Sequence, residues 1–203
     1  MAIPAQLAFL PGASGDTSLW QPVAERLRTC VGRRMHVGWP GFGATPADPS
    51  IRTLPDLAQR VAASIEEPTA LIAQSMGGVV ALLVALERPE LVTHLVLAAL
   101  SGGFDLTPHG ARNWRPPRNQ MTASLPFLFA AYDDDLSPRL PSVAIPTLLL
   151  CGDQDPVSPV AAARWLAAVL PQASLHVVRG GSHTFARTHA DEVAPVIDAH
   201  LSP

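Results

Sequence analysis

Short apolar runs alternate with longer helical stretches along most of the chain. Runs of β-branched and aliphatic residues, bounded by Gly, Pro or polar clusters, predict strands at residues 6–10, 34–38, 69–74, 91–100, 147–151 and 174–178. Helical spacing of apolar positions predicts helices at residues 19–28, 54–65, 76–87, 160–170 and 189–200. Strands that alternate with helices predict an α/β fold with a parallel sheet covered by helices.

Residues 102–141 interrupt this alternation. Prolines, arginines and aromatic residues are mixed in this segment, and the alternation of strands and helices resumes after it. We therefore expect one domain over residues 1–203, with 102–141 as a short cap insertion rather than a second domain. Because this insertion is short, we also expect a rather open pocket beneath it.

Composition narrows the class of protein. Of 203 residues, 48% are hydrophobic and 15% are charged, which is typical of a globular domain with a substantial core. The net charge of −3 gives no indication of nucleic-acid binding. Cys30 and Cys151 are far apart and match no metal or redox spacing, so we expect buried free thiols in a reducing compartment.

Targeting signals are not evident in the sequence. No basic segment precedes the first apolar stretch, and no apolar run approaches the ~18 residues of a membrane helix. All 14 basic residues are arginine, and prolines are frequent, which suggests a GC-rich bacterial source. We expect a cytoplasmic protein, free of membrane association, that acts on a small molecule, and a homodimer is a candidate assembly.

The stretch LIAQSMGGVV at residues 71–80 carries the first chemical signal. It predicts a strand, a sharp turn and a helix, with Ser75 at the apex. The stretch resembles the nucleophile elbow G-x-S-x-G of the alpha/beta-hydrolase superfamily, with Ala73 and Gly77 at the two small positions. The resemblance implies a strained backbone that exposes the Ser75 hydroxyl, whereas the alternative is an ordinary strand-to-helix turn.

Two later segments resemble the acid and base motifs of the same superfamily. LLLCGDQDPV at 148–157 ends a strand in a G-x-x-D turn, and the family match implies Asp155 as the acid and Asp153 as loop structure. Gly181-Ser182-His183 ends the last strand and implies His183 as the base. The order serine, acid, histidine is that of the superfamily. The alternatives are that both aspartates are turn residues, or that another histidine is the base: His36, His94, His109, His176, His189 or His200.

The resemblance also implies an oxyanion hole. The backbone N–H of Met76 would be one donor, and the N–H of Ala13 in the loop after the first strand would be the second. Pro11 stands where relatives carry a histidine. The resemblance covers nearly the whole chain outside 102–141, and it implies a six-strand parallel sheet that lacks the N-terminal antiparallel hairpin and has Ser75 after its third strand.

Residues of the cap are candidates for substrate contacts. Arg112, Arg115 and Arg118 recur every three residues around Trp114, a pattern suited to binding a carboxylate or phosphate, although a solvated basic stretch is the alternative. Phe127 is a candidate for lining an acyl pocket, or for docking the cap. The three aspartates at 133–135 are expected to be a solvated turn rather than a metal site.

Taken together, the motifs predict a serine hydrolase that cleaves a small carboxylic ester or thioester through Ser75, His183 and Asp155 and needs no metal or organic cofactor. Two alternatives stay open. One is a triad-dependent lyase, synthase or C–C bond hydrolase on the same scaffold. The other is a catalytically silent binding protein with this fold.

Overall fold

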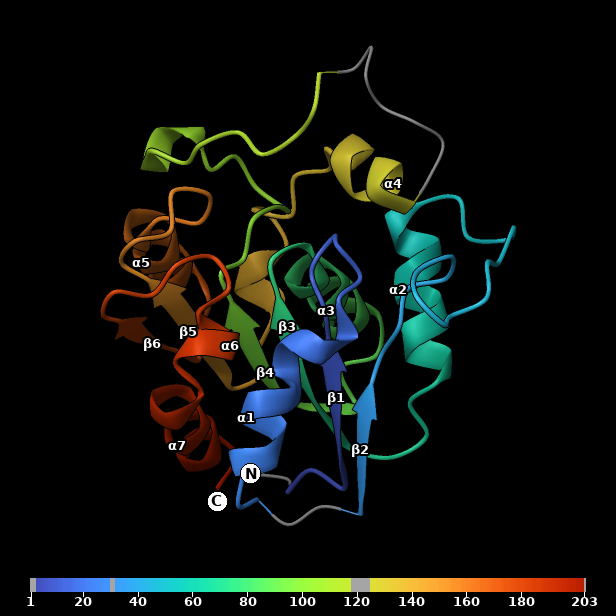
Figure 1. The fold of residues 1–203 in the computed structure, drawn as a ribbon, viewed down its shortest axis with the longest axis horizontal. Coiled ribbons are helices and arrows are strands. Elements are labelled where there is room, and N and C mark those ends of the chain that lie inside the picture. Colours follow the sequence, from blue (N-terminus) through green and yellow to red (C-terminus); the bar gives the residue numbers. More distant parts are fainter. Residues whose placement is uncertain (1–2, 30–31, 118–124, 203) are drawn as a thin grey trace.

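A computed structural model describes residues 3–29, 32–117 and 125–202, so Cys30 and Arg118 lie outside the described residues. The described strands form one six-stranded, fully parallel sheet in the order β2-β1-β3-β4-β5-β6 (Figure 1). The strands are β1 (Gln6–Leu10), β2 (Arg33–His36), β3 (Thr69–Gln74), β4 (Val92–Ala98), β5 (Thr147–Gly152) and β6 (Ala173–Val178). The predicted sheet is confirmed: Ser75 follows the third strand, and no described strand pairs in antiparallel fashion.

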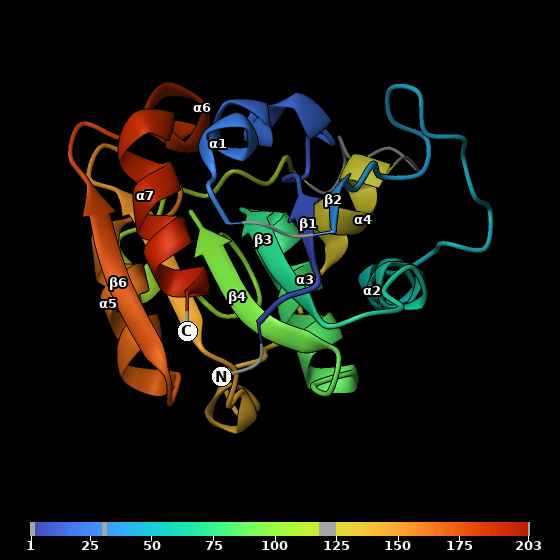
Figure 2. The same ribbon diagram turned by 90° about the horizontal axis from the view of Figure 1, so that it is seen from below.

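Helices cover both faces of the sheet (Figure 2). One layer contains α2, α3 and α5, and the other contains α1, α6 and α7. The helices are α1 (Gln21–Arg26), α2 (Leu54–Ala63), α3 (Met76–Glu87), α4 (Leu125–Ala131), α5 (Val160–Val169), α6 (Phe185–Thr188) and α7 (Ala190–Leu201).

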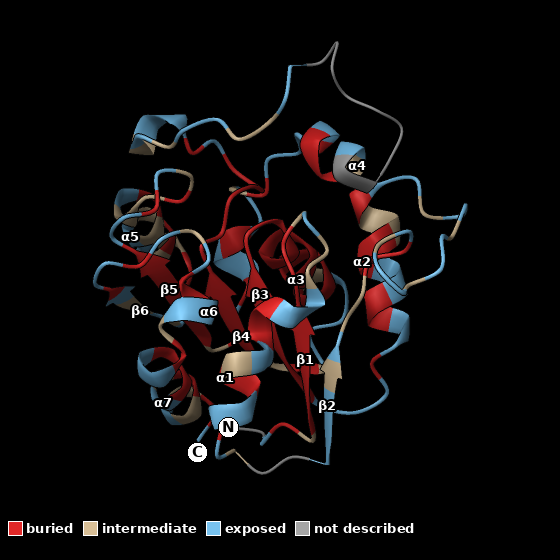
Figure 3. Ribbon diagram, viewed as in Figure 1, coloured by how far each residue is buried: buried red, intermediate tan, exposed pale blue. Residues whose placement is uncertain are grey.

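The alternation of side chains along each strand divides the core into two parts. In β1, Leu7 and Phe9 pack with the α1, α6 and α7 layer, whereas Ala8 and Leu10 pack with the α2, α3 and α5 layer. All four are buried, as expected for a parallel strand covered on both faces (Figure 3). The central strand β3 and the first ten residues of α3 are likewise buried, so the Ser75 turn lies between two rigid elements.

Two helix boundaries differ from the sequence prediction. A 3₁₀ turn at Thr17–Trp20 precedes α1, and its N-cap is Asp16, whose carboxylate accepts the Ser18 N–H. The predicted C-terminal helix at 189–200 is observed as α7, and the short helix α6, which was not predicted, precedes it. His189, whose backbone (φ −121°) is not helical, separates the two. Local capping and dihedral angles decide both boundaries, and hydrophobic spacing does not reveal them.

The predicted cap, residues 102–141, connects β4 to the turn before β5. Residues 103–117 and α4 lie above the carboxyl ends of the strands (Figure 1). They include α4 and 3₁₀ turns at Thr107–His109 and Leu140–Ser142. Phe129 of α4 is fully buried against Trp39, with ring centroids 5.8 Å apart, and the Leu136 N–H donates to the carbonyl of Gly103. The Phe129 contact thus anchors α4 to Trp39 outside the cap, whereas the hydrogen bond between Leu136 and Gly103 joins the two ends of the cap segment to each other.

Two further sequence predictions concern free thiols and membrane helices. Cys151 is a buried free thiol at the end of β5, and burial raises its pKa to about 11. None of the described helices is both long and apolar enough to cross a lipid bilayer.

A buried histidine gives the fold a testable pH dependence. His94 in β4 is 1% exposed, and neither ring nitrogen has a hydrogen-bond partner among the described residues. Burial, together with the nearby His200 ring at 5.2 Å, lowers the pKa of His94 from 6.5 to about 4. Between these values the unfolded chain binds the proton and the folded chain does not, so stability falls as pH decreases from about 6.5 to 4.

At about 1.4 kcal/mol for each unit of pKa difference, His94 lowers the unfolding free energy of the wild type by about 3 kcal/mol between pH 7 and pH 4. We predict that this decrease is absent in His94→Leu. Urea unfolding at a series of pH values measures this loss. The control is His36→Gln, which replaces an exposed histidine and is expected to keep the wild-type pH dependence. An identical dependence in His94→Leu and wild type would contradict the prediction.

Candidate active site

Ser75 lies at the turn between β3 and α3 in a strained backbone conformation. Its dihedral angles are φ 55° and ψ −126°, in a region that non-glycine residues rarely adopt. The Ser75 N–H donates to the carbonyl of Ala98 at 2.8 Å, and the Ser75 carbonyl accepts from Gly78 at 2.9 Å. The strained turn is therefore held from both sides, by a neighbouring strand and by the first turn of α3.

Small residues around the turn are required by close packing. A Cβ atom at Gly77 would lie 2.2 Å from the carbonyl oxygen of Pro11, and a Cβ at Gly12 would lie 2.3 Å from the side-chain oxygen of Gln74. The loop after β1 therefore packs directly against the Ser75 turn. This close approach explains why position 77, two residues after Ser75, is a glycine.

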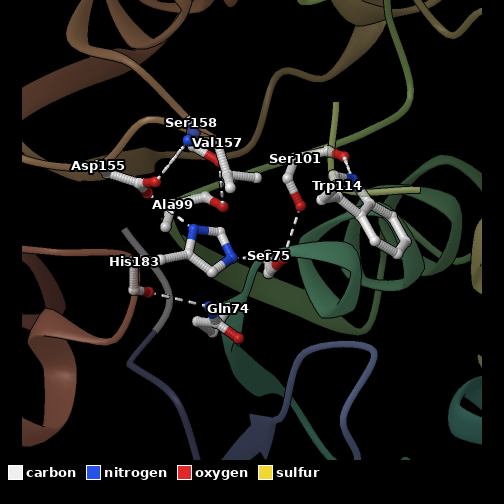
Figure 4. Close-up of polar contacts among 9 residues, drawn as sticks. All are labelled: Gln74, Ser75, Ala99, Ser101, Trp114, Asp155, Val157, Ser158 and His183. Atoms are coloured by element: carbon white, nitrogen blue, oxygen red, sulfur yellow. Dashed lines mark hydrogen bonds and ion pairs between the residues drawn. The ribbon is translucent and has the colours of Figure 1, made fainter. Parts of the chain in front are cut away.

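The side chains of Ser75, His183 and Asp155 form one chain of hydrogen bonds (Figure 4). His183 Nε2 lies 3.0 Å from Ser75 Oγ, and His183 Nδ1 lies 2.7 Å from Asp155 Oδ2. The three residues come from the carboxyl ends of three different strands, β3, β5 and β6. The structure thus brings together the three residues that the sequence motifs singled out.

Asp155 is placed to fix the tautomer of His183. Its side chain is fully buried, and its second oxygen accepts the N–H groups of Val157 at 2.8 Å and Ser158 at 3.1 Å. A carboxylate saturated by N–H donors acts as an acceptor toward the imidazole, so Nδ1 carries the proton. Nε2 is then free to accept the hydroxyl proton of Ser75.

The loop that carries His183 is held by polar contacts from two directions. The side-chain amide of Gln74 donates to the His183 carbonyl at 3.1 Å, and the Asp153 carboxylate accepts the Gly180 N–H at 2.7 Å. Asp153 therefore has the loop role predicted from the sequence. Gln74 was not singled out there, and the available signal was a polar residue at the buried end of a strand, directly before Ser75.

Two tryptophans fix the loop that contains Pro11, Gly12 and Ala13. Trp39 Nε1 donates to the Gly12 carbonyl at 2.8 Å, and Trp20 Nε1 donates to the Leu10 carbonyl at 3.1 Å. These indoles brace the loop although Pro11 occupies the position where relatives carry a histidine. Sequence reasoning missed both, because the indole and its acceptor are separated by loop residues whose path the sequence does not specify.

The two N–H groups assigned to an oxyanion hole flank the serine. Met76 is the first residue of α3, so its N–H has no acceptor within the helix. The N–H of Ala13 follows Gly12, and a Cβ at Gly12 would be 3.2 Å from Ser75 Cβ. The Met76 amide therefore follows Ser75 directly, and the Ala13 amide belongs to the loop that packs against the Ser75 turn.

A second hydroxyl lies against Ser75. Ser101, in the segment after β4, has its Oγ 2.5 Å from Ser75 Oγ, and its residue is 1% exposed (Figure 4). The sequence motifs gave no reason to select Ser101, because it lies 26 residues from Ser75 in a segment without a recognised pattern.

A cavity of about 1000 Å³ extends from Ser101 beneath the cap segment. Phe127, which is 40% exposed, and Trp114 line it, and the indole of Trp114 donates to the Ser101 carbonyl at 3.2 Å. These two predicted substrate contacts therefore line a space that reaches Ser101, although Ser75 and His183 are not among the residues that line it.

The two described arginines of the predicted anion site also line this cavity, but they do not form an open basic patch. Arg115 donates to the Tyr132 carbonyl at 3.1 Å and lies over the Trp114 ring, and burial lowers its pKa. Arg112 is exposed, and its backbone N–H donates to the Pro156 carbonyl. Four carboxylates line the same cavity: Asp105, Asp133, Asp134 and Asp135.

The described residues contain no group of three or more His, Cys, Asp or Glu side chains arranged to hold a metal ion. The other histidines have separate surroundings: His36 stacks on Phe9, His176 pairs with Glu192, and His109 packs against Trp165. Within the described chain, His183 is the histidine that is hydrogen-bonded to Ser75.

Comparison with known proteins agrees with this geometry. The model of the alpha/beta hydrolase family matches residues 7–135. The chain is 26% identical over 225 residues to a pimeloyl-[acyl-carrier protein] methyl ester esterase of Chromobacterium violaceum, covering 88% of this chain and 87% of that protein. It is 25% identical over 220 residues to the biotin biosynthesis bifunctional protein BioHC of Cellvibrio japonicus, covering 87% of this chain but only 43% of that longer protein.

Among solved structures, a thermophilic esterase from Thermogutta terrifontis superposes with a TM-score of 0.79 at 19% identity, over 99% of this chain and 90% of that one. This likeness supports the fold. The family match spans more than half of the chain and includes the Ser75 turn. The protein therefore belongs to the alpha/beta hydrolase family of enzymes.

Proposed function

We propose that the protein is a serine hydrolase that cleaves a small carboxylic ester or thioester. The observation that carries this proposal is the hydrogen-bonded chain from Ser75 through His183 to the buried Asp155, with Ser75 held at positive φ. A serine hydroxyl needs such a base within hydrogen-bond distance to become a nucleophile. The arrangement supplies both the base and the carboxylate that orients it.

In the first half of the reaction, Ser75 Oγ attacks the carbonyl carbon while His183 Nε2 accepts the hydroxyl proton. Asp155 stabilises the resulting imidazolium through Nδ1. The imidazolium then protonates the departing alcohol or thiol, and an acyl-enzyme on Ser75 remains. In the second half, His183 takes a proton from water, the hydroxide attacks the acyl-enzyme, and the proton returns to Ser75 as the acid leaves.

The developing negative charge on the carbonyl oxygen needs fixed donors. We assign this role to the N–H groups of Met76 and Ala13. The support for Met76 is its position at the start of α3, directly after Ser75, and the support for Ala13 is the packing of Gly12 against Ser75. Trp39 and Trp20 hold the loop rigid, which keeps the Ala13 donor in place before the substrate binds.

Carboxylic esters are favoured as substrates by two observations. One relative over nearly the full length of both chains is named a methyl ester esterase. The cavity beside Ser101 presents four carboxylates and two guanidiniums, so the surroundings of the described arginines do not favour an anionic substrate. The excess of carboxylates over guanidiniums disfavours a lyase, synthase or C–C bond hydrolase that would bind an anionic substrate through an arginine cluster. Ester hydrolysis is therefore the proposed activity.

We predict that the protein hydrolyses p-nitrophenyl esters and that Ser75→Ala lowers kcat at least ~10³-fold, because no other group replaces the nucleophile. A series from acetate to decanoate measures the activity and the preferred acyl length. The matched control is Ser182→Ala, an exposed serine next to His183, for which near wild-type rates are expected.

Two results would contradict ester hydrolysis. Equal rates for wild type and Ser75→Ala would exclude Ser75 as the nucleophile. Absence of turnover together with fluorophosphonate labelling of wild type, but not of Ser75→Ala, would favour a lyase or C–C bond hydrolase instead.

We predict that Asp155→Asn lowers kcat by roughly 10³–10⁴-fold, because an amide that donates toward Nδ1 favours the wrong imidazole tautomer. The matched control is Asp153→Asn, whose amide oxygen still accepts the Gly180 N–H, with an expected change below about threefold. Steady-state kinetics on the preferred ester distinguish the two. Similar losses in both variants would show that Asp155 acts only through loop structure.

We predict that Trp39→Phe lowers kcat about tenfold with a smaller effect on KM, because the Gly12 carbonyl loses its donor and the Ala13 N–H is less well placed in the transition state. Phenylalanine keeps an aromatic ring against Phe129. Trp165→Phe is the control, since the Trp165 ring packs on Phe104 and His109 rather than on the loop. An unchanged kcat in Trp39→Phe would show that the Trp39 hydrogen bond to the Gly12 carbonyl does not contribute to catalysis.

A further inference from the structure

The hydroxyl of Ser101 contacts Ser75, but the reaction steps proposed above for Ser75, His183 and Asp155 do not use it. Its oxygen lies 2.5 Å from Ser75 Oγ, which is closer than His183 Nε2 at 3.0 Å. Ser101 is 1% exposed, and its Oγ has no other hydrogen-bond partner among the described residues. A buried hydroxyl whose single contact is a reactive oxygen keeps its hydrogen bond only while that oxygen remains a good acceptor.

The position of Ser101 is held independently of Ser75. Ala99, at the end of β4, has φ 49°, a second strained non-glycine residue in the described chain. Its carbonyl accepts from Ser158 Oγ at 2.8 Å, and the Ser158 N–H donates to Asp155. The Ser101 carbonyl accepts from the Trp114 indole. The backbone around Ser101 is therefore held by the acid loop on one side and by the cap segment on the other (Figure 4).

The direction of the bond follows from counting protons. Because Nδ1 of His183 donates to Asp155, Nε2 is the acceptor, and the single hydroxyl proton of Ser75 lies on the bond to Nε2. The hydrogen bond between the two hydroxyls uses the proton of one of them. The Ser75 proton is already used in the bond to Nε2, so the proton in this bond is that of Ser101. Ser101 therefore donates and Ser75 Oγ accepts.

We propose that Ser101 promotes deacylation by donating a hydrogen bond to Ser75 Oγ that is lost when the serine is acylated and regained when the acyl group leaves. This inference rests on the proposed hydrolase function. In the acyl-enzyme, Ser75 Oγ is an ester oxygen whose lone pairs are delocalised into the carbonyl, so it is a weak acceptor. The Ser101 donor is then buried without a good partner, which raises the free energy of the acyl-enzyme.

The effect falls on one half of the reaction. In deacylation the bond between the carbonyl carbon and Ser75 Oγ breaks, and His183 returns its proton to Oγ while Ser101 donates to the same oxygen without transferring a proton. In acylation the free serine already accepts this bond, so the transition state gains nothing further from it. Ser101 thus accelerates deacylation and leaves acylation nearly unchanged.

The experiment is stopped-flow measurement of p-nitrophenol release from the preferred p-nitrophenyl ester by wild type and Ser101→Ala. The expected result is a fall of about tenfold in the deacylation rate constant, seen in kcat, with kcat/KM within about threefold of wild type. An initial burst approaching one equivalent should appear, and mass spectrometry should detect the acyl adduct on Ser75. Fluorophosphonate labelling, which requires attack alone, is expected at the wild-type rate.

Two further variants separate chemistry from packing. Ser101→Thr keeps a hydroxyl and is expected to recover most of the deacylation rate if it folds, which thermal melting checks. Thr147→Val removes a buried hydroxyl that donates to the Ile145 carbonyl at the start of β5, away from Ser75, and it is expected to produce no accumulation of acyl-enzyme.

Failure of this inference is distinguishable from failure of the hydrolase proposal. If wild type turns over the ester but Ser101→Ala lowers kcat and kcat/KM equally, or slows phosphonate labelling, Ser101 only positions Ser75 and the inference is wrong. If wild type releases no more p-nitrophenol than Ser75→Ala, the proposed hydrolysis is itself wrong and the inference falls with it.

Discussion

The close approach of the loop after β1 to the turn between β3 and α3 is the constraint on which the site depends. The Pro11 carbonyl occupies the space that a side chain at Gly77 would need, and Gly12 lies against Gln74 and Ser75. With the buried α3 fixed behind the turn, this contact leaves Ser75 little freedom to relax from its positive φ. Strain of this kind persists because the surrounding packing determines the backbone more strongly than the residue's own preference does.

Two strained residues, rather than one, define the carboxyl edge of the sheet. Ser75 ends β3, and Ala99 ends its neighbour β4, both at positive φ. The first orients a hydroxyl toward His183, and the second leads the chain toward Ser101. Since the β4 turn is also bonded to Ser158 in the acid loop, the ends of three adjacent strands form one connected network. Such a network keeps its donors and acceptors in place without help from a ligand.

The sheet and the positions of Ser75, Asp155 and His183 could be predicted because local patterns specify them. Alternating apolar runs mark each strand, and short motifs at the strand ends mark each polar group. Ser101, Gln74 and Trp39 could not be found in this way, since no motif marks them and the fold alone brings them to their partners, 26, 109 and 27 residues away. The arginine spacing in the cap did not reveal which groups these side chains contact. Arg115 is directed to the Tyr132 carbonyl by tertiary packing, which a periodicity of three does not specify.

Trp39 connects α4 of the cap with the loop that contains Gly12. One side of its indole packs on Phe129 of the cap, while its N–H holds the Gly12 carbonyl beside Ser75. A substitution at Phe129 would therefore be transmitted to the loop that borders the serine, whereas Phe127, exposed on the cavity wall, has no such connection described. Divergence of substrate preference within α4 is accordingly expected to proceed through position 127 and to leave position 129 aromatic, although the two positions are only two residues apart in the same helix.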